Sequence, residues 1–181
     1  MTKIDQNRPF IPTRIAILTM SDTRTLDEDA SGALLARLVK ESGHEVVDRN
    51  LLNDEIAAIR GQVKQWIADK QIDVVITTGG TGFTGRDVTP EAVQPLFEKV
   101  IEGFSILFHQ QSFPKIGTST IQSRACAGVA AGTYIFCLPG SNGACRYAWE
   151  GIIKLQIYNR NRPCNIVEIM PILEEHRSKI S

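Results

Sequence analysis

Short apolar runs alternate with amphipathic segments along this chain of 181 residues. Apolar stretches predict strands over residues 14–20, 44–52, 73–77 and 134–138, and the unbroken apolar run at 14–20 predicts a buried strand. Apolar residues spaced one helical turn apart predict helices over 28–42, from a cap at Asn53 through Ile67, and over 91–100, 103–113, 118–126 and 144–158. Such alternation is typical of an α/β fold, here a three-layer α/β/α arrangement around a mostly parallel central sheet.

The length of the chain suits one domain with a substantial hydrophobic core. Its first residues are mostly polar, and two prolines close that segment. We therefore expect a flexible N-terminal arm over residues 1–12, a single domain over 13–170 and a C-terminal tail over 171–181. A short apolar stretch at 166–169 is interpreted as an edge strand.

The overall charge of the chain is balanced, with 20 Lys and Arg residues against 20 Asp and Glu residues. No global basic field would therefore attract nucleic acid or an anionic membrane surface. The longest apolar runs, such as 15–18, are too short to cross a bilayer, and the first 12 residues lack the apolar core of a signal peptide. We expect a cytoplasmic protein without nucleic-acid or membrane partners.

The most distinctive chemistry lies between Val74 and Ala92, where an apolar strand runs into a loop rich in glycine and threonine. Glycine backbone N–H groups can approach a ligand closely, and loops of this kind bind phosphate. Asp87 lies in the same loop, and a carboxylate beside a phosphate indicates a metal ion such as Mg²⁺. The structural alternative is a tight turn that needs positive φ angles at its glycines.

Two familiar phosphate motifs fit this loop only in part. Residues 80–85 match G-x-G-x-x-G, but the helix signal at Thr89–Pro90 comes several residues late. No acid ends a strand about twenty residues further on, where a dinucleotide ribose would need it. The Walker A spacing also fails, because Arg86 and Asp87 stand where its Lys and hydroxyl should be.

Polar residues also follow the other predicted strands. Ser21 and Asp22 follow the first strand, Asp54 follows the second, and 139–141 follow the last. Because ligands of parallel sheets bind beyond the carboxyl ends of the strands, we expect these segments to share one edge with the glycine-rich loop. Asp54 and Asp87 would then hold Mg²⁺ against a phosphate chain. Each segment also has a purely structural explanation. Ser21 and Asp22 could form a helix-entry turn, Asp54 could be an acid in the first turn of a helix, and the residues after the last strand could cap a helix.

A further polar patch lies near the middle of the chain, where Thr118, Ser119 and Thr120 are followed by Ser123 and Arg124. Hydroxyl groups and a guanidinium there could hold a phosphate or a polar ring. A solvated helix face is the equally simple alternative.

These segments together resemble the MoaB/MogA molybdopterin-binding family of molybdenum cofactor biosynthesis. The glycine-rich loop followed by Arg-Asp-Val-Thr-Pro-Glu-Ala is the most specific part of the likeness, which extends from about residue 10 to residue 170. The matching segments are 10–19, 77–82, 86–92, 117–125, 138–141, 144–150 and 162–165.

The resemblance implies a ligand, molybdopterin, which is a pterin dithiolene with a terminal phosphate. In active members of the family, molybdopterin and Mg-ATP give adenylyl-molybdopterin and pyrophosphate, and the proteins form trimers or hexamers. The two acids of the family fall on Asp54 and Asp87, which would be catalytic and would bind Mg²⁺. The residues expected to contact molybdopterin or ATP are Ser21, Asp22, Thr78, Gly79, Gly80, Thr81, Gly82, Thr89, Pro90, Glu91, Ser119, Ser123, Arg124, Pro139, Gly140 and Ser141.

Two other functions remain compatible with the same residues. The chain could be a non-catalytic oligomeric protein that binds molybdopterin or a precursor in the same pathway. It could also be a different nucleotide or phosphate-ester enzyme built on the same loop. Tight pterin binding without an ATP-dependent product would favour the first of these.

Overall fold

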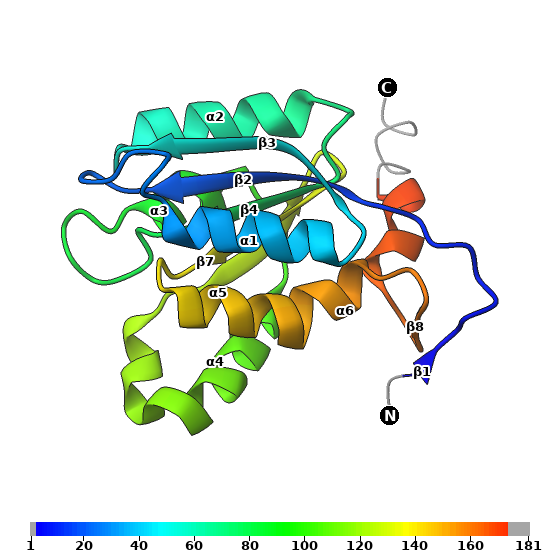
Figure 1. Ribbon diagram of the computed structural model, residues 1–181. Coiled ribbons are helices and arrows are strands. Elements are labelled where there is room, and N and C mark those ends of the chain that lie inside the picture. Colours follow the sequence, from blue (N-terminus) through cyan, green and yellow to red (C-terminus); the bar gives the residue numbers. More distant parts are fainter. Residues whose placement is uncertain (1–2, 174–181) are drawn as a thin grey trace.

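A six-stranded sheet forms the centre of the molecule, as the computed structural model of residues 3–173 shows (Figure 1). Four neighbouring strands pair in parallel, and the antiparallel pairs are those that β6 forms with β7 and with the short edge strand β5. The predicted mostly parallel sheet is therefore confirmed. In spatial order the strands are β3 (Glu45–Leu52), β2 (Arg14–Met20), β4 (Val74–Thr78), β7 (Thr133–Leu138), β6 (Cys126–Ala130) and β5 (Lys99–Val100).

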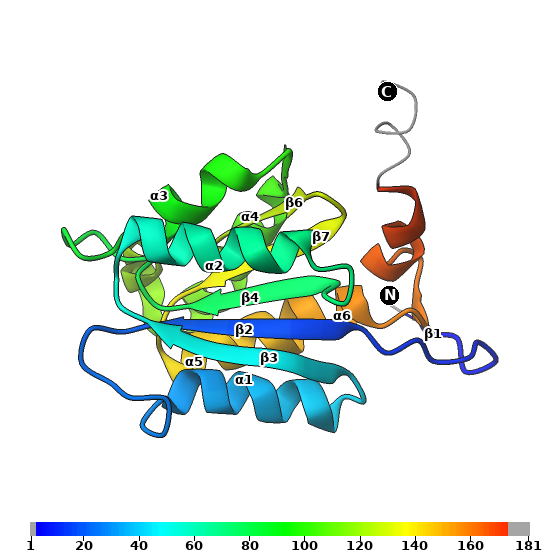
Figure 2. The same cartoon turned by 90° about the horizontal axis from the view of Figure 1, so that it is seen from above.

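Helices cover both faces of the sheet, which confirms the predicted three layers (Figures 1 and 2). Successive side chains of β2 alternate between two cores: Ile15 and Ile17 pack on one face, and Ala16 and Leu18 pack on the other. The first face is covered by α1 (Ala30–Glu41), α4 (Glu102–Ile116) and α5 (Asn142–Ala148), and the second by α2 (Ile56–Ala68) and α3 (Thr89–Val93).

The helix predicted over 91–100 is wrong in its second half. The α-helix ends at Val93, a 3₁₀ turn follows over Gln94–Leu96, and Lys99–Val100 form the edge strand β5. Pro95 brings no N–H group to continue the helix. Phe97 is already extended, and the next residues pair with β6.

The chain after α4 also differs from its predicted course. Residues Gly117–Gln122 form a 3₁₀ helix, in place of the short α-helix expected over 118–126. The strand that follows, Cys126–Ala130, was not predicted; it forms a tight hairpin with β7. Ala131 and Gly132 make the turn, and both have positive φ angles, 50° and 85°, as a two-residue hairpin turn of the primed type requires.

The predicted helix over 144–158 is present, although it changes pitch on the way. It begins as α5, passes through a π-helical segment at Trp149–Ile153 and ends as α6 (Lys154–Ile157). The edge strand expected over 166–169 is wrong, because Ile166–Glu168 and Met170–Ile172 are 3₁₀ turns. Most of the tail expected over 171–181 lies outside the described residues.

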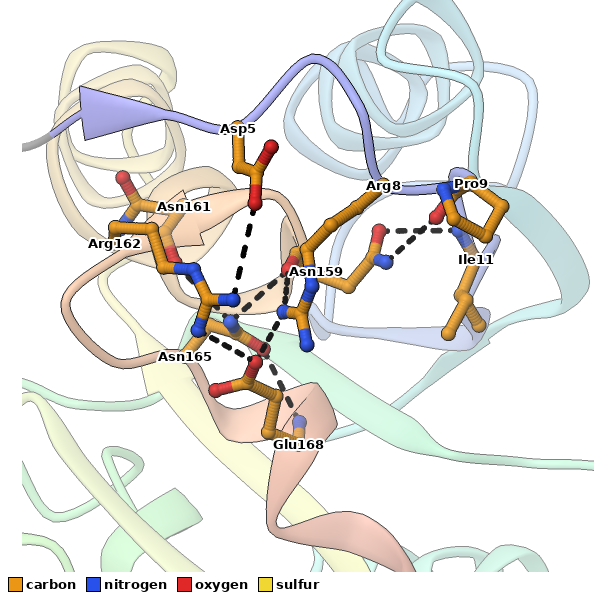
Figure 3. Close-up of polar contacts among 9 residues, drawn as sticks. All are labelled: Asp5, Arg8, Pro9, Ile11, Asn159, Asn161, Arg162, Asn165 and Glu168. Atoms are coloured by element: carbon orange, nitrogen blue, oxygen red, sulfur yellow. Dashed lines mark hydrogen bonds and ion pairs between the residues drawn. The ribbon is translucent and has the colours of Figure 1, made fainter.

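Contacts with the C-terminal segment hold the N-terminal arm, residues 3–12, in place (Figure 3). Strand β1 (Lys3–Ile4) pairs antiparallel with β8 (Asn161–Arg162). The amide group of buried Asn159 accepts a hydrogen bond from the Ile11 N–H (3.1 Å) and donates one to the Pro9 carbonyl (2.8 Å). Arg8 and Arg162 both reach the carboxylate of Glu168.

We expect Asn159→Ala to destabilise the protein by about 1–2 kcal/mol, because two backbone groups of the arm lose their partner. Unfolding in urea measures the change, and amide exchange should rise over residues 9–13. Arg37→Gln is the control: it removes an exposed ion pair with Glu41 on α1, away from the arm, and should cost well under about 1 kcal/mol. Equal losses in the two variants would contradict the role given to the buried amide.

Candidate functional site

Four loops meet beyond the carboxyl ends of the four parallel strands. They begin at Ser21 after β2, Asn53 after β3, Gly79 after β4 and Pro139 after β7. Backbone hydrogen bonds join neighbouring loops: the Ser21 N–H donates to the Leu52 carbonyl (2.9 Å), and the Gly79 N–H donates to the Leu138 carbonyl (3.0 Å). The expected gathering of these segments at one edge is therefore present.

The glycine-rich loop depends on glycine at two positions for steric reasons. Gly79 has a φ angle of 103°, and a Cβ atom there would lie 2.5 Å from the Met20 carbonyl oxygen. Gly80 has a φ angle of 61°, and a Cβ atom there would lie 2.7 Å from Oδ1 of Asp54. The missing side chain of Gly80 thus leaves room for the Asp54 carboxylate directly against the loop.

Backbone N–H groups of this loop are only partly used. The Gly79 N–H bonds to Leu138, and the Gly82 N–H bonds to the carboxylate of Asp87. No hydrogen bond within residues 3–173 uses the N–H of Gly80 or Thr81. Thr89 binds the backbone of the loop through two groups. Its hydroxyl donates a hydrogen bond to the Gly79 carbonyl (2.9 Å), and its N–H donates one to the Gly80 carbonyl (2.9 Å).

Asp54 carries an orphaned carboxylate oxygen. Its Oδ1 is buried and has no hydrogen-bond partner among the described residues. Burial raises the pKa of this carboxyl group, and the negative charges of Asp22 and Asp87 raise it further, while Arg86 opposes them. A buried, unpaired carboxylate is costly, and a bound cation would remove that cost.

The carboxylate of Asp87 is held more firmly. Its Oδ2 accepts hydrogen bonds from the N–H (2.8 Å) and the hydroxyl (2.5 Å) of Thr84. Burial alone would raise the pKa of Asp87, but these bonds, the Gly82 N–H and the charge of Arg124 together lower it. Asp87 is therefore ionised across the physiological range. It lies close enough to Asp54 for its charge to affect that group.

The pair suits a divalent cation that takes only two ligands from protein. No group of three metal-ligating side chains occurs in the part of the chain that the structure describes. Mg²⁺ commonly binds one or two carboxylates and completes its shell with phosphate oxygens and water. The orphaned Oδ1 of Asp54, set against a loop with unused N–H groups, fits such an ion bound together with a phosphate chain.

Arg86 joins three of the four loops. Its guanidinium forms two hydrogen bonds with the Asp22 carboxylate, of 2.7 and 2.8 Å, and also approaches Glu55 at 3.3 Å. Asp22 in turn accepts a hydrogen bond from the Asp54 N–H (3.1 Å). Asp22 was predicted as a site residue from the sequence, whereas Arg86 was not. The adjacent Arg-Asp pair within a ligand-binding loop is the signal that could have indicated a role for Arg86.

The hydroxyl of Thr78 is engaged inside the protein. Its side chain is fully buried, and its hydroxyl donates to the Pro139 carbonyl (3.1 Å) and contacts the Cys145 thiol (3.2 Å). Thr78, which was expected to contact the ligand, thus ties the glycine-rich loop to the loop after β7.

Arg124 acts in a similar way as a clamp on the loop. Its guanidinium donates to the carbonyls of Gly82 (2.8 Å) and Asp87 (2.6 Å) and forms an ion pair with Glu91. These bonds occupy the group that was expected to hold a polar ring of the ligand. Glu91 is likewise paired, whereas Pro90 is buried in the first turn of α3.

Four of the other predicted residues line a cavity of 270 Å³ beside the start of α5. Ser119, Ser123, Pro139 and Ser141 line it, and Ser123 has a buried hydroxyl oxygen without a partner among residues 3–173. The Ser141 hydroxyl accepts from the Ala144 N–H (3.2 Å) and caps α5. Thr120, from the predicted polar patch, also lines the cavity, and the lining residues that were not predicted are Phe108, Ser112, Ile116, Gln122, Gly143, Ala144 and Tyr147.

Two predicted residues lie on either side of these features. Gly140 packs against Gly79, since a Cβ atom on Gly140 would lie 3.3 Å from the Gly79 Cα. The Ser21 hydroxyl accepts hydrogen bonds from the N–H groups of Thr23 (3.4 Å) and Arg24 (3.2 Å) and so shapes the loop after β2.

No helix in the described residues is both long and apolar enough to span a membrane.

Fold and site together define a three-layer α/β protein whose polar site lies at the carboxyl edge of a mostly parallel sheet. A family model described as "Probable molybdopterin binding domain" matches residues 16–159. The chain belongs to this molybdopterin-binding family, as the resemblance of its motifs predicted.

Similar proteins agree with that assignment. The chain is 54% identical over 156 residues to "Molybdenum cofactor biosynthesis protein B" of Escherichia coli (strain K12), a match covering 86% of this chain and 92% of the relative. A crystal structure of a molybdenum cofactor biosynthesis protein B aligns with a TM-score of 0.81 at 38% identity, covering 94% and 99% of the two chains. The tungsten cofactor synthesizing protein MoaB from Pyrococcus furiosus aligns with a TM-score of 0.71 at 28% identity, covering 91% and 96%.

Proposed function

We propose that this protein works in molybdenum cofactor biosynthesis, where it binds molybdopterin and transfers the adenylyl group of Mg-ATP to it. The observation that supports this most directly is the buried, unpartnered Oδ1 of Asp54 beside the glycine-rich loop that also carries Asp87. Two acids at a phosphate-binding loop suit a reaction between phosphate groups. Family membership and the similarity to cofactor biosynthesis proteins support the choice of substrate.

In the proposed reaction, an oxygen of the molybdopterin phosphate attacks the α-phosphorus of ATP, a new P–O bond forms, and the bond to pyrophosphate breaks. Such transfers depend on positioning and on neutralising charge. The unused N–H groups of Gly80 and Thr81 would donate to phosphoryl oxygens. Asp54 and Asp87 would hold Mg²⁺, which supplies positive charge to the phosphate chain when it is bound.

The pterin end of the substrate would occupy the 270 Å³ cavity next to α5. Hydroxyl groups of Ser119 and Ser123 offer hydrogen bonds to the polar ring, and Tyr147 offers an aromatic surface. The unpartnered hydroxyl of Ser123 would gain a partner on binding. Thr78 and Arg124 support the site by holding the loops that flank this cavity.

The decisive experiment is incubation of the purified protein with molybdopterin and Mg-ATP, followed by detection of pyrophosphate and of a molybdopterin–AMP adduct by mass spectrometry. Stoichiometric formation of both products is the expected result. Omission of Mg²⁺, with chelator added, should abolish them. Pterin binding without any adduct would contradict the transferase proposal and favour the non-catalytic binding role. Nucleotide turnover without molybdopterin would instead favour a different nucleotide enzyme.

We further propose that the protein forms a homo-trimer or hexamer, as the resemblance implies. The segment from α4 through the 3₁₀ helix at 117–122 exposes several large apolar side chains that a second copy would cover; they are Ile106, Leu107, Phe113, Ile116 and Ile121. Light scattering at micromolar concentration should therefore give three or six times the chain mass of 20.0 kDa. A mass of 20.0 kDa would refute the oligomer.

A further inference from the structure

The ion pair between Arg86 and Asp22 connects three loops of the site. Asp22 lies in the loop after β2, and Arg86 lies in the loop between β4 and α3. Through Asp22 the pair reaches the backbone of Asp54, and through Glu55 it reaches the start of α2. Among the described residues, no other pair of side chains joins the loop after β2 and the loop between β4 and α3 to the backbone of Asp54.

The carboxylate of Asp54 has no support of its own. Within residues 3–173, Oδ1 is buried without a partner, and no hydrogen bond reaches the other carboxylate oxygen. Among the residues that the structure describes, the only hydrogen bond that holds Asp54 from another loop is the one from its N–H to Oδ1 of Asp22, at 3.1 Å. Asp87 differs, because Thr84 fixes its carboxylate directly. The position of Asp54 thus depends on where Asp22 holds its backbone.

Asp22 needs Arg86 to stay in that position. Asp22 is a partly exposed carboxylate on a loop, and the two guanidinium bonds of 2.7 and 2.8 Å fix its orientation. The same Oδ1 accepts from Arg86 and from the Asp54 N–H. A change at Arg86 would therefore reach Asp54 through a chain of two hydrogen bonds.

We propose that Arg86 and Asp22 are positioning residues that hold the Asp54 carboxylate in place for the cation and phosphate chain of the substrate. This inference rests on the proposed adenylyl transfer, because it assigns Asp54 its partner there. Residues that orient a ligand of a metal commonly alter affinity or activity 10- to 100-fold when they are replaced. Their contribution to stability is small, because the pair is largely exposed: Arg86 by 57% and Asp22 by 34%.

The competing explanation is that the two side chains act only by their charge. Loss of the positive charge of Arg86 would then strengthen the binding of a cation, and loss of the negative charge of Asp22 would weaken it. A positioning role predicts the same direction for both changes, because either one releases the Asp54 backbone. Changes in cation affinity of opposite sign in the two variants would thus indicate a charge effect, and changes of the same sign would indicate positioning.

The test compares Arg86→Gln, Asp22→Asn and the double variant with the unchanged protein. Both single variants should lower kcat of adenylyl transfer and weaken the apparent Mg²⁺ affinity, each by about 10- to 100-fold. The double variant should be no worse than the poorer single variant, because either substitution alone already breaks the ion pair that holds Asp54 in place. Arg86→Lys should recover part of the rate. Arg146→Gln and Glu150→Gln are the matched controls. Each breaks the exposed ion pair between Arg146 on α5 and Glu150 in the π-helical segment that follows, and neither should change these two quantities.

A second readout does not require turnover. Amide hydrogen exchange of the peptide over residues 52–56 should become faster in Arg86→Gln and in Asp22→Asn, while the melting temperature stays within a few degrees of the parent. Opposite shifts in Mg²⁺ affinity, additive effects or unchanged exchange at Asp54 would each overturn the positioning role while the transferase activity of the parent stands. A parent protein without adduct formation would refute the proposed function itself, even if the exchange result were as expected.

Discussion

Asp54→Asn is expected to reduce the rate of adenylyl transfer by about 100- to 1000-fold, the usual cost of removing one electrostatic stabiliser from a transition state. Pyrophosphate release under saturating Mg-ATP measures this loss. The fold should remain intact, because Asn has nearly the same shape as Asp. Molybdopterin binding, followed by a thermal shift without Mg²⁺, should change little, since the cavity beside α5 does not include Asp54.

The same substitution should leave the protein as stable as before or more stable. Burial and the charge of Asp22 raise the pKa of Asp54 in the folded state. A raised carboxyl pKa means that ionisation at neutral pH favours the unfolded chain, so a neutral side chain removes a penalty. Glu41→Gln, at an exposed ion pair on the far end of α1, is the control and should keep full activity. Full adenylyl transfer by the Asp54→Asn variant would refute the proposed cation site.

The second large effect concerns stability towards acid. His44 is 4% exposed and packs between Phe10 and Trp149, and its Nδ1 accepts a hydrogen bond from the Thr13 N–H (3.1 Å). Burial lowers the pKa of His44 to about 4, and the charge of Lys154 contributes in the same direction. The folded protein therefore holds this ring neutral, whereas the unfolded chain protonates it near its ordinary pKa of 6.5.

Between pH 6.5 and about 4 the unfolded state binds a proton that the folded state does not, so the free energy of unfolding falls as the pH falls through this range. The stabilisation is present in full above pH 6.5, and the loss from this one ring reaches roughly 3 kcal/mol at the lower end. Urea unfolding at pH 7 and at pH 4.5 gives the difference.

His44→Gln is the variant that isolates this ring, because its amide oxygen can accept from Thr13 and does not titrate. It should be less stable at pH 7, owing to poorer packing, but should lose much less stability on acidification than the parent. All other titrating groups are common to both proteins, and their contributions cancel in the comparison. An equal loss in the two proteins would show that His44 is not the source.

Three of the strands that the sequence predicts well, β2, β4 and β7, consist of apolar residues because helices cover the sheet on each side. The edge strand β3 is only partly buried, and its Val and Leu residues stand beside charged ones. β6 was missed because Cys126–Ala130 consists mostly of small residues with little preference for strands. Its strand conformation comes from pairing with β7 through the turn at Ala131–Gly132, which is a tertiary cause that a local pattern does not contain.

In the site, too, some features follow from local sequence patterns and others depend on tertiary contacts. The acids and the glycine-rich loop were predictable, because residues that follow parallel strands must meet at one edge. The internal roles of Thr78 and Arg124 were not, since each depends on carbonyl groups that other loops bring near. Arg86 was missed as a positioning residue for a related reason: its partner Asp22 is 64 residues away in the chain.

The hairpin turn at Ala131–Gly132 has a practical consequence. It joins β6 to the beginning of β7, so it lies at the opposite edge of the sheet from the loops that begin at Pro139. A short affinity tag inserted at this turn, with Gly or Asn where the backbone is left-handed, would immobilise the molecule without obstructing ligand entry.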